Sequence, residues 1–300
     1  MKNLLIKSLF ILFAVNISFA QKWMTDIDIA QKLALVQNKM VLMVWKGTTE
    51  YPYPVFVNDD KGRTIFIDDL FTDEEVSPLI WEHFVPVIVN ENKYGLMYYD
   101  IKGKRSQRYI DKFNDNSIKI MDVNGNIINV TNTYSEDLQN ITEIIKNYSI
   151  STAFVTPELQ GYNNEKTFYS AYYLASKYMD FSMYLNENLR PELMTLLTIY
   201  INEAKLNTKK VSKEDQLILQ QRCDLLEIQQ YLLLKRPKKV LRQLKKINAE
   251  EIENKNKPFV AFLYYTAYSI LENEKNAKKW KAEVSSVNLK KAQLIINLNS

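Results

Sequence analysis

The pattern of apolar residues changes partway along this 300-residue chain, and that change limits the folds open to it. From Trp23 to about Ile150, short runs rich in β-formers alternate with helical runs, which is typical of an α/β layer fold. From Asn164 onward, apolar residues recur with helical spacing only. We therefore expect an α/β domain over residues 21–150 and an all-α domain over 164–300, joined by a linker over 151–163.

Residues 1–20 have the pattern of a secretory signal peptide. Lys2 and Lys7 precede an apolar stretch, residues 9–15, that is shorter than the roughly 20 residues needed to span a bilayer. Ser18 and Ala20 then supply small residues at the cleavage positions. We expect an exported protein, periplasmic or secreted, with no integral membrane segment after cleavage.

Charge and cysteine content exclude some classes of function. The chain has 39 Lys and Arg against 35 Asp and Glu, and this small basic excess does not predict a nucleic-acid partner. Its single cysteine, Cys223, cannot form an intramolecular disulfide or run a two-thiol exchange cycle alone.

Several elements are expected in the first half. The apolar run Met40–Trp45 predicts a central buried strand, and Asn124-Gly125 is a strong signal for a hairpin turn. The other expected elements are a helix capped by Thr25 and running to Asn38, a helix starting at Thr72, a strand over Phe84–Val89, and a last helix capped by Ser135.

This order, over roughly residues 23–150, resembles the thioredoxin fold of exported bacterial thioredoxin-like proteins. The segments that carry the resemblance are "ALVQNKMVLMVW", "DEEVSPLIWEHFVPVIVNEN" and "SIKIMDVNGNIINV". The resemblance implies that the strand ending in Trp45 leads into the redox loop of the family, and that the hairpin completes the sheet.

The chain departs from the family at the redox centre. A Cys-x-x-Cys motif is expected after Trp45, and a cis-proline before the hairpin; here Asn114-Asp115-Asn116 takes the proline's place. The residues that follow Trp45 here are Lys46, Gly47, Thr48 and Thr49. Threonine hydroxyls cannot replace the thiols of the motif, because they do not form disulfides. We expect no catalytic residue, cofactor or metal ligand. The positions of this degenerate redox-site loop are Trp45, Lys46, Gly47, Thr48, Thr49, Tyr51 and Tyr53.

Prolines rule out a regular helix directly after this loop. Pro52 and Pro54 lack a backbone donor, so the chain is expected to run extended into an additional hairpin around Asp60-Lys61-Gly62. Tyr51, Tyr53 and Phe56 could form a contact patch or pack inside the domain; the sequence leaves both open.

The second half resembles degenerate tetratricopeptide repeats. "RCDLLEIQQYLLLKRPKKVLRQLKKI" and "AYSILENEKNAKKWKAEV" each read as a helix, a short polar turn and a second helix. Val240 and Ala277 occupy matching positions, separated by nearly the family's period of about 34 residues. The resemblance implies stacked helix hairpins that bind a protein or peptide; a helical domain that only packs on the first half is the alternative.

Three other features have both a structural and a functional interpretation. His83 is the only histidine, and it fits a helix end better than the base of a hydrolase. Cys223 fits a buried apolar position better than a reactive thiol. The basic segment 235–247 predicts a solvated helix face, or else a surface for acidic partners or anionic lipid.

The function expected from these patterns is non-catalytic binding or scaffolding in the bacterial envelope, and the chain is more easily read as a binding protein than as an enzyme. The alternative is a thiol-disulfide oxidoreductase relative, acting in cell redox homeostasis through Cys223 or through a partner's thiols. A hydrolase that uses His83 is a third class.

Overall fold

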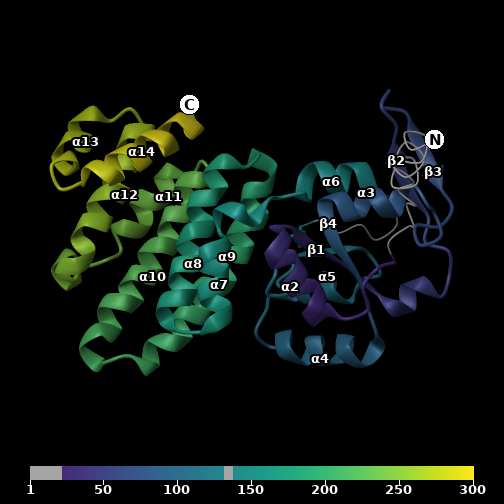
Figure 1. The fold of residues 1–300 in the computed structure, drawn as a ribbon. Coiled ribbons are helices and arrows are strands. Elements are labelled where there is room, and N and C mark those ends of the chain that lie inside the picture. The colour runs from purple at the N-terminus through teal and green to yellow at the C-terminus, as the bar shows by residue number, and fades with distance from the viewer. Residues whose placement is uncertain (1–21, 132–137) are drawn as a thin grey trace, which may run out of the picture.

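The computed structural model describes residues 22–131 and 138–300, and Figure 1 shows an α/β half followed by a helical half. The expected signal peptide lies outside the described residues. The elements of the α/β half are α2 (Ile27–Gln37), β1 (Met40–Trp45), β2 (Val55–Asn58), β3 (Thr64–Ile67), α3 (Val76–His83), β4 (Phe84–Val89), α4 (Glu91–Ile101), α5 (Gln107–Asn114), β5 (Lys119–Met121), β6 (Gln139–Asn140) and α6 (Ile141–Tyr148).

The main sheet has the strand order β4-β1-β5, with β1 in the middle as its apolar run predicts. β1 is parallel to β4 and antiparallel to β5, and its first five residues are completely buried. Two isolated bridges extend the sheet, since Met24 pairs in parallel with Val87 and Ile127 pairs antiparallel with Met121. The expected hairpin around Asn124-Gly125 therefore lies at the sheet edge next to β5, and Gly125 adopts the positive φ of 80° that its turn requires.

The second sheet has the order β3-β2-β6 and contains the expected additional hairpin. β2 and β3 pair antiparallel, and the Asp59 carboxylate accepts hydrogen bonds from the N–H groups of Lys61 and Arg63 across the turn. Gly62 supplies the positive φ of 75° in this turn. β2 also pairs in parallel with the two residues of β6.

Helix starts differ from the predicted ones. α2 is capped by Asp26 rather than Thr25, because the Asp26 carboxylate accepts from two backbone N–H groups of the first turn. α3 begins at Val76 and not at Thr72, since Asp73 instead holds a turn by accepting from the N–H of Val76.

The last helix of this half also starts later than predicted. Ser135 lies outside the described residues, and α6 begins at Ile141, because Gln139 and Asn140 are extended to pair with β2. Asn140 then caps α6 through a side-chain bond to the N–H of Glu143. Between β4 and β5, where the sequence analysis assigns no element, the chain forms α4 and α5. α4 has no fully buried residue, so its apolar periodicity is weak.

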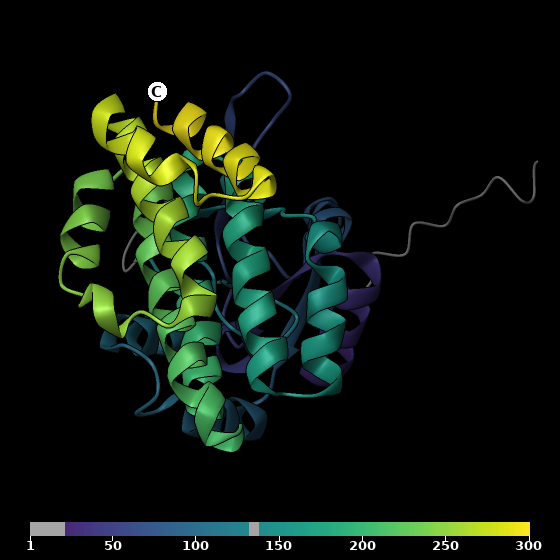
Figure 2. The ribbon, with the colours of Figure 1, turned by 90° about the vertical axis from the view of Figure 1, so that its left-hand side faces the viewer.

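The helical half consists of α7 (Thr156–Asn164), α8 (Phe168–Phe181), α9 (Arg190–Asn207), α10 (Lys213–Leu233), α11 (Pro237–Leu244), α12 (Lys257–Ile270), α13 (Glu274–Lys281) and α14 (Ser286–Asn299). From α7 to α13 each helix packs against the next, and α14 packs on α12 and α10. Figure 2 shows this half in front of the α/β half. The segment 151–163, expected to be a linker, is folded: it contains most of α7, whose Leu159 and Tyr162 are buried.

Two helix hairpins, α10–α11 and α12–α13, share the same turn. Lys235 and Glu272 have positive φ angles of 55° and 54°. The N–H of the residue after each one, Arg236 and Asn273, donates to a carbonyl in the last turn of the preceding helix. Lys235 and Glu272 are separated by the same number of residues as Val240 and Ala277, so the similarity seen in the sequence extends to the backbone.

Candidate functional site

The loop after β1, residues 45–53, is the site predicted from the sequence. It begins with a single 3-10 turn, Lys46–Thr49. The Thr48 hydroxyl donates to the Trp45 carbonyl at 2.6 Å, and the Thr49 hydroxyl donates to the Lys46 carbonyl at 2.8 Å. Both hydroxyls are therefore engaged in holding the turn.

Gly47 is required by a close contact within this loop. A Cβ atom at Gly47 would lie 2.5 Å from the indole ring of Trp45, which is closer than real Cβ atoms approach. The ring of Trp45 in turn packs against Tyr94, with 5.7 Å between ring centroids. Tyr51, by contrast, is 76% exposed.

Tyr53 connects the loop to the segment Asn114-Asp115-Asn116. Its hydroxyl donates to the carbonyl of Asn116 at 3.1 Å and accepts from the side-chain amide of Gln139 at 3.2 Å. Burial raises the pKa of this phenol far above its ordinary value. Tyr53 is therefore a neutral side chain that links the two segments by hydrogen bonds. Among the described residues there is no cis peptide bond, in this segment or elsewhere.

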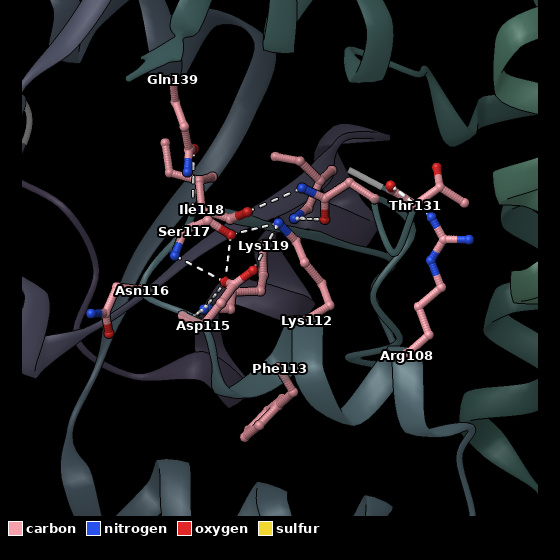
Figure 3. A network of polar contacts seen from close by, with 12 residues as sticks. Arg108, Lys112, Phe113, Asp115, Asn116, Ser117, Ile118, Lys119, Thr131 and Gln139 are labelled. Carbon is pink, nitrogen blue, oxygen red and sulfur yellow. Dashed lines mark hydrogen bonds and ion pairs between the residues drawn. The ribbon is translucent and has the colours of Figure 1, made fainter. Parts of the chain in front are cut away.

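A cluster of polar side chains lies behind Asn116. Figure 3 shows Ser117 and the amino groups of Lys112 and Lys119 gathered around Asp115, and the Lys112 amino group donates to the Ser117 hydroxyl. Lys112 and Lys119 are both buried, and Lys119 Nζ lies 3.1 Å from the Asp115 carboxylate. Burial lowers the pKa of Lys119 to about 8, although Asp115 opposes the shift. No sequence pattern indicates this cluster, because its lysines fall in short segments without a recognisable motif.

The other candidate residues do not join the loop. Cys223 lies in α10 of the helical half and is completely buried, and burial raises the pKa of its thiol to about 12. His83 ends α3, and its side chain forms no hydrogen bond or ion pair with the described residues. Within the same residues, no group of three or more His, Cys, Asp or Glu side chains could hold a metal ion.

A cleft lies between the α/β half and the helical half. The cleft has a volume of about 820 Å³ and is walled by α2, α4 and the Asn124 hairpin on one side and by α7 and α9 on the other. Leu96 of α4 and Leu206 of α9 line it from opposite halves, and they remain 62% and 67% exposed. Sequence reasoning missed this cleft, because its walls come from segments far apart in the chain.

Behind Asn124 and Asn126, which line the cleft, lies a buried polar junction between the halves. Asp122, at the start of the hairpin turn, is fully buried and accepts from the N–H groups of Asn124 and Asn126 at 2.9 Å each. The hydroxyl of Tyr200, on α9, donates to the other oxygen of Asp122 and accepts from the Asn124 amide at 2.7 Å. Burial raises the pKa of Asp122 to about 6.

An ion pair across the cleft strengthens this junction. Arg105, after α4, lies 3.4 Å from Glu203 of α9, and Glu203 also accepts a hydrogen bond from Tyr162. Lys166 places its amino group over the ring of Tyr162, 5.3 Å from the centroid. The cleft thus combines exposed apolar side chains with fixed charges of both signs.

Comparison with known proteins assigns no family to the chain, since no family model, no curated protein and no solved structure matches it. Among residues 22–131 and 138–300, no helix is both long and apolar enough to cross a membrane.

Proposed function

We propose that the chain is a non-catalytic, exported binding protein of the bacterial envelope, and that it holds a protein or peptide partner in the cleft between its two halves. The observation that carries the proposal is the cleft itself, about 820 Å³ in volume. It presents exposed Leu96 and Leu206 beside fixed polar groups. Clefts between domains are preferred binding sites, and apolar walls with a few oriented polar groups are typical of them.

A thioredoxin-like assignment of the α/β half is supported by its sheet. The order across the sheet is Met24, β4, β1, β5 and Ile127. The central strand β1 pairs in parallel with β4 and antiparallel with β5. A thioredoxin-like scaffold would place its redox centre in the loop after β1. In that loop, residues 46–49 carry hydroxyls bonded to backbone carbonyls instead of thiols.

A tetratricopeptide-like assignment of the helical half is supported by its repeated turn. Lys235 and Glu272 take the same left-handed conformation at matching positions of two successive hairpins. Stacked hairpins of this kind provide extended surfaces that bind peptides.

The alternative, a thiol-disulfide oxidoreductase relative, has less support. Thiol exchange needs an accessible thiolate, and Cys223 is buried with a pKa raised to about 12. Only a role that uses a partner's own thiols is compatible with these properties.

The cleft is tested by comparing three single variants of the mature protein in chemical cross-linking with an envelope extract. Leu96→Asp and Leu206→Asp each place a charge on one wall of the cleft. Val287→Asp is the matched control, because Val287 is 74% exposed on α14 and does not line the cleft. We expect wild type and Val287→Asp to form the same cross-linked species, and both cleft variants to lose it.

Circular dichroism will show that the variants are folded, as expected for exposed positions. Retention of the species by both Leu96→Asp and Leu206→Asp, or its equal loss in Val287→Asp, would place the partner elsewhere on the molecule.

A further inference from the structure

The turn between α10 and α11, together with α11 itself, carries a concentrated positive charge. Residues 235–246 contain seven Lys and Arg residues and no acidic residue. The apolar side of α11, Val240 and Leu244, is buried against the neighbouring helices. The cations are therefore kept together on the outer side of one helix hairpin.

Five of these cations surround a hollow rather than a flat surface. A pocket of about 540 Å³ is lined by Lys235, Arg236, Pro237, Lys238, Lys239, Arg242 and Leu271. The acidic residues that follow Leu271 in sequence, Glu272 and Glu274, do not line it. A concave site surrounded by one sign of charge concentrates ligands of the opposite sign.

Most of this charge is not neutralised within the molecule. Lys235 lies 3.0 Å from Glu187, and Lys239 lies over the ring of Tyr231 at 3.9 Å from its centroid. Arg236, Lys238 and Arg242 form no ion pair with any residue that the structure describes. Three cations thus remain available to a ligand in the pocket.

We propose that this pocket binds a compact anion that carries two or more phosphate groups, either in solution or as a lipid headgroup. Two guanidinium groups, from Arg236 and Arg242, can each hold a phosphate through paired N–H bonds. Lys238 adds a point charge between them in sequence. A ligand with several phosphates engages more of these cations than a single carboxylate can. This site is separate from the cleft, so the proposal does not depend on the proposed function.

The test measures binding of inorganic tripolyphosphate to the mature protein by calorimetry. The double variant Lys238→Gln/Arg242→Gln should weaken binding at least tenfold. Lys278→Gln/Lys279→Gln is the matched control, since it also removes two exposed positive charges, from α13, outside the pocket. The control should weaken binding less than about threefold, because distant surface charges are screened by salt. Glutamine is a good helix former, so both variants are expected to fold.

A second arm separates the two sources of the ligand. Sedimentation with phosphatidylcholine vesicles is compared with and without cardiolipin, whose headgroup carries two phosphates. Binding to tripolyphosphate alone assigns the pocket to a soluble anion, and pocket-dependent binding to cardiolipin vesicles assigns it to a lipid headgroup. Absence of binding in both arms, or equal weakening by the two double variants, would overturn the proposal.

Discussion

At the scale of single residues, the connection between the two halves centres on the buried carboxylate of Asp122. It accepts hydrogen bonds from two backbone N–H groups and from the side chains of Tyr200 and Asn126, which belong to α9 and to the hairpin. The Asn124-Gly125 turn could be predicted from the sequence, because its signal is local. The burial of Asp122 could not be predicted, because it depends on the packing of Tyr200, from the helical half, against the hairpin.

Asp122→Asn should change how stability depends on pH. The pKa of Asp122 is raised from 3.8 to about 6 in the folded protein, so between these values the folded state binds the proton more tightly than the unfolded state. This residue therefore stabilises the wild type more as pH falls from about 6 to 4, by about 1–3 kcal/mol in total.

The measurement is the free energy of urea unfolding at several pH values across that window. Asp122→Asn should lack this gain at low pH, whereas Asp60→Asn, at an exposed turn position, should keep it. Identical pH profiles for wild type and Asp122→Asn would show that the carboxylate is not buried as described.

Gly47→Ala tests the packing of the loop after β1. The added methyl group would meet the Trp45 ring at 2.5 Å, so the ring must move away from Tyr94. We expect a loss of about 1–3 kcal/mol in the free energy of unfolding and a change in tryptophan fluorescence. Gly161→Ala, where nothing lies within 4 Å of the new atom, is the control and should leave the fluorescence unchanged.

At the scale of elements, long periodic segments were predictable and short ones were not. β1, β4 and the helix hairpins of the second half follow from their apolar patterns. α4 was missed because none of its residues is fully buried, and the start of α6 was misplaced because Gln139 and Asn140 pair with a distant strand. At α6 the pairing with β2, rather than local preference, sets where the helix begins.

Glu272→Gly tests the repeated helix-hairpin turn. Glu272 has a φ of 54°, a conformation that costs a non-glycine residue about 1 kcal/mol. Glycine at this position should raise the free energy of unfolding by about 0.5–1 kcal/mol, measured by urea denaturation. Glu274→Gly, in the first turn of α13, should instead lower it. A loss of stability in Glu272→Gly would mean that the turn is not left-handed in solution.

At the scale of the whole molecule, the cleft and the basic pocket form only because separate segments of the chain pack next to one another. The walls of the cleft come from α2, α4, α7, α9 and the Asn124 hairpin, and the hairpin is held to α9 by the hydroxyl of Tyr200. The sequence shows that the loop after β1 contains no cysteine. It cannot indicate that a cleft forms between the halves, because no local pattern encodes which helices approach the hairpin.

The same arrangement places the only thiol of the chain inside the helical half, away from the loop after β1. Cys223 is completely buried on α10, and burial raises its pKa to about 12. A thiol in this environment is protonated and inaccessible, so the folded protein should be unable to exchange disulfides through it.

The central claim, a binding protein without thiol chemistry, is tested most directly on native protein that comprises residues 21–300. Its reaction with a disulfide reagent is measured alongside an insulin-reduction assay. The account predicts no insulin reduction, and labelling of Cys223 only once denaturant unfolds the helical half. Rapid labelling of the native protein, together with insulin reduction that Cys223→Ser abolishes, would contradict it.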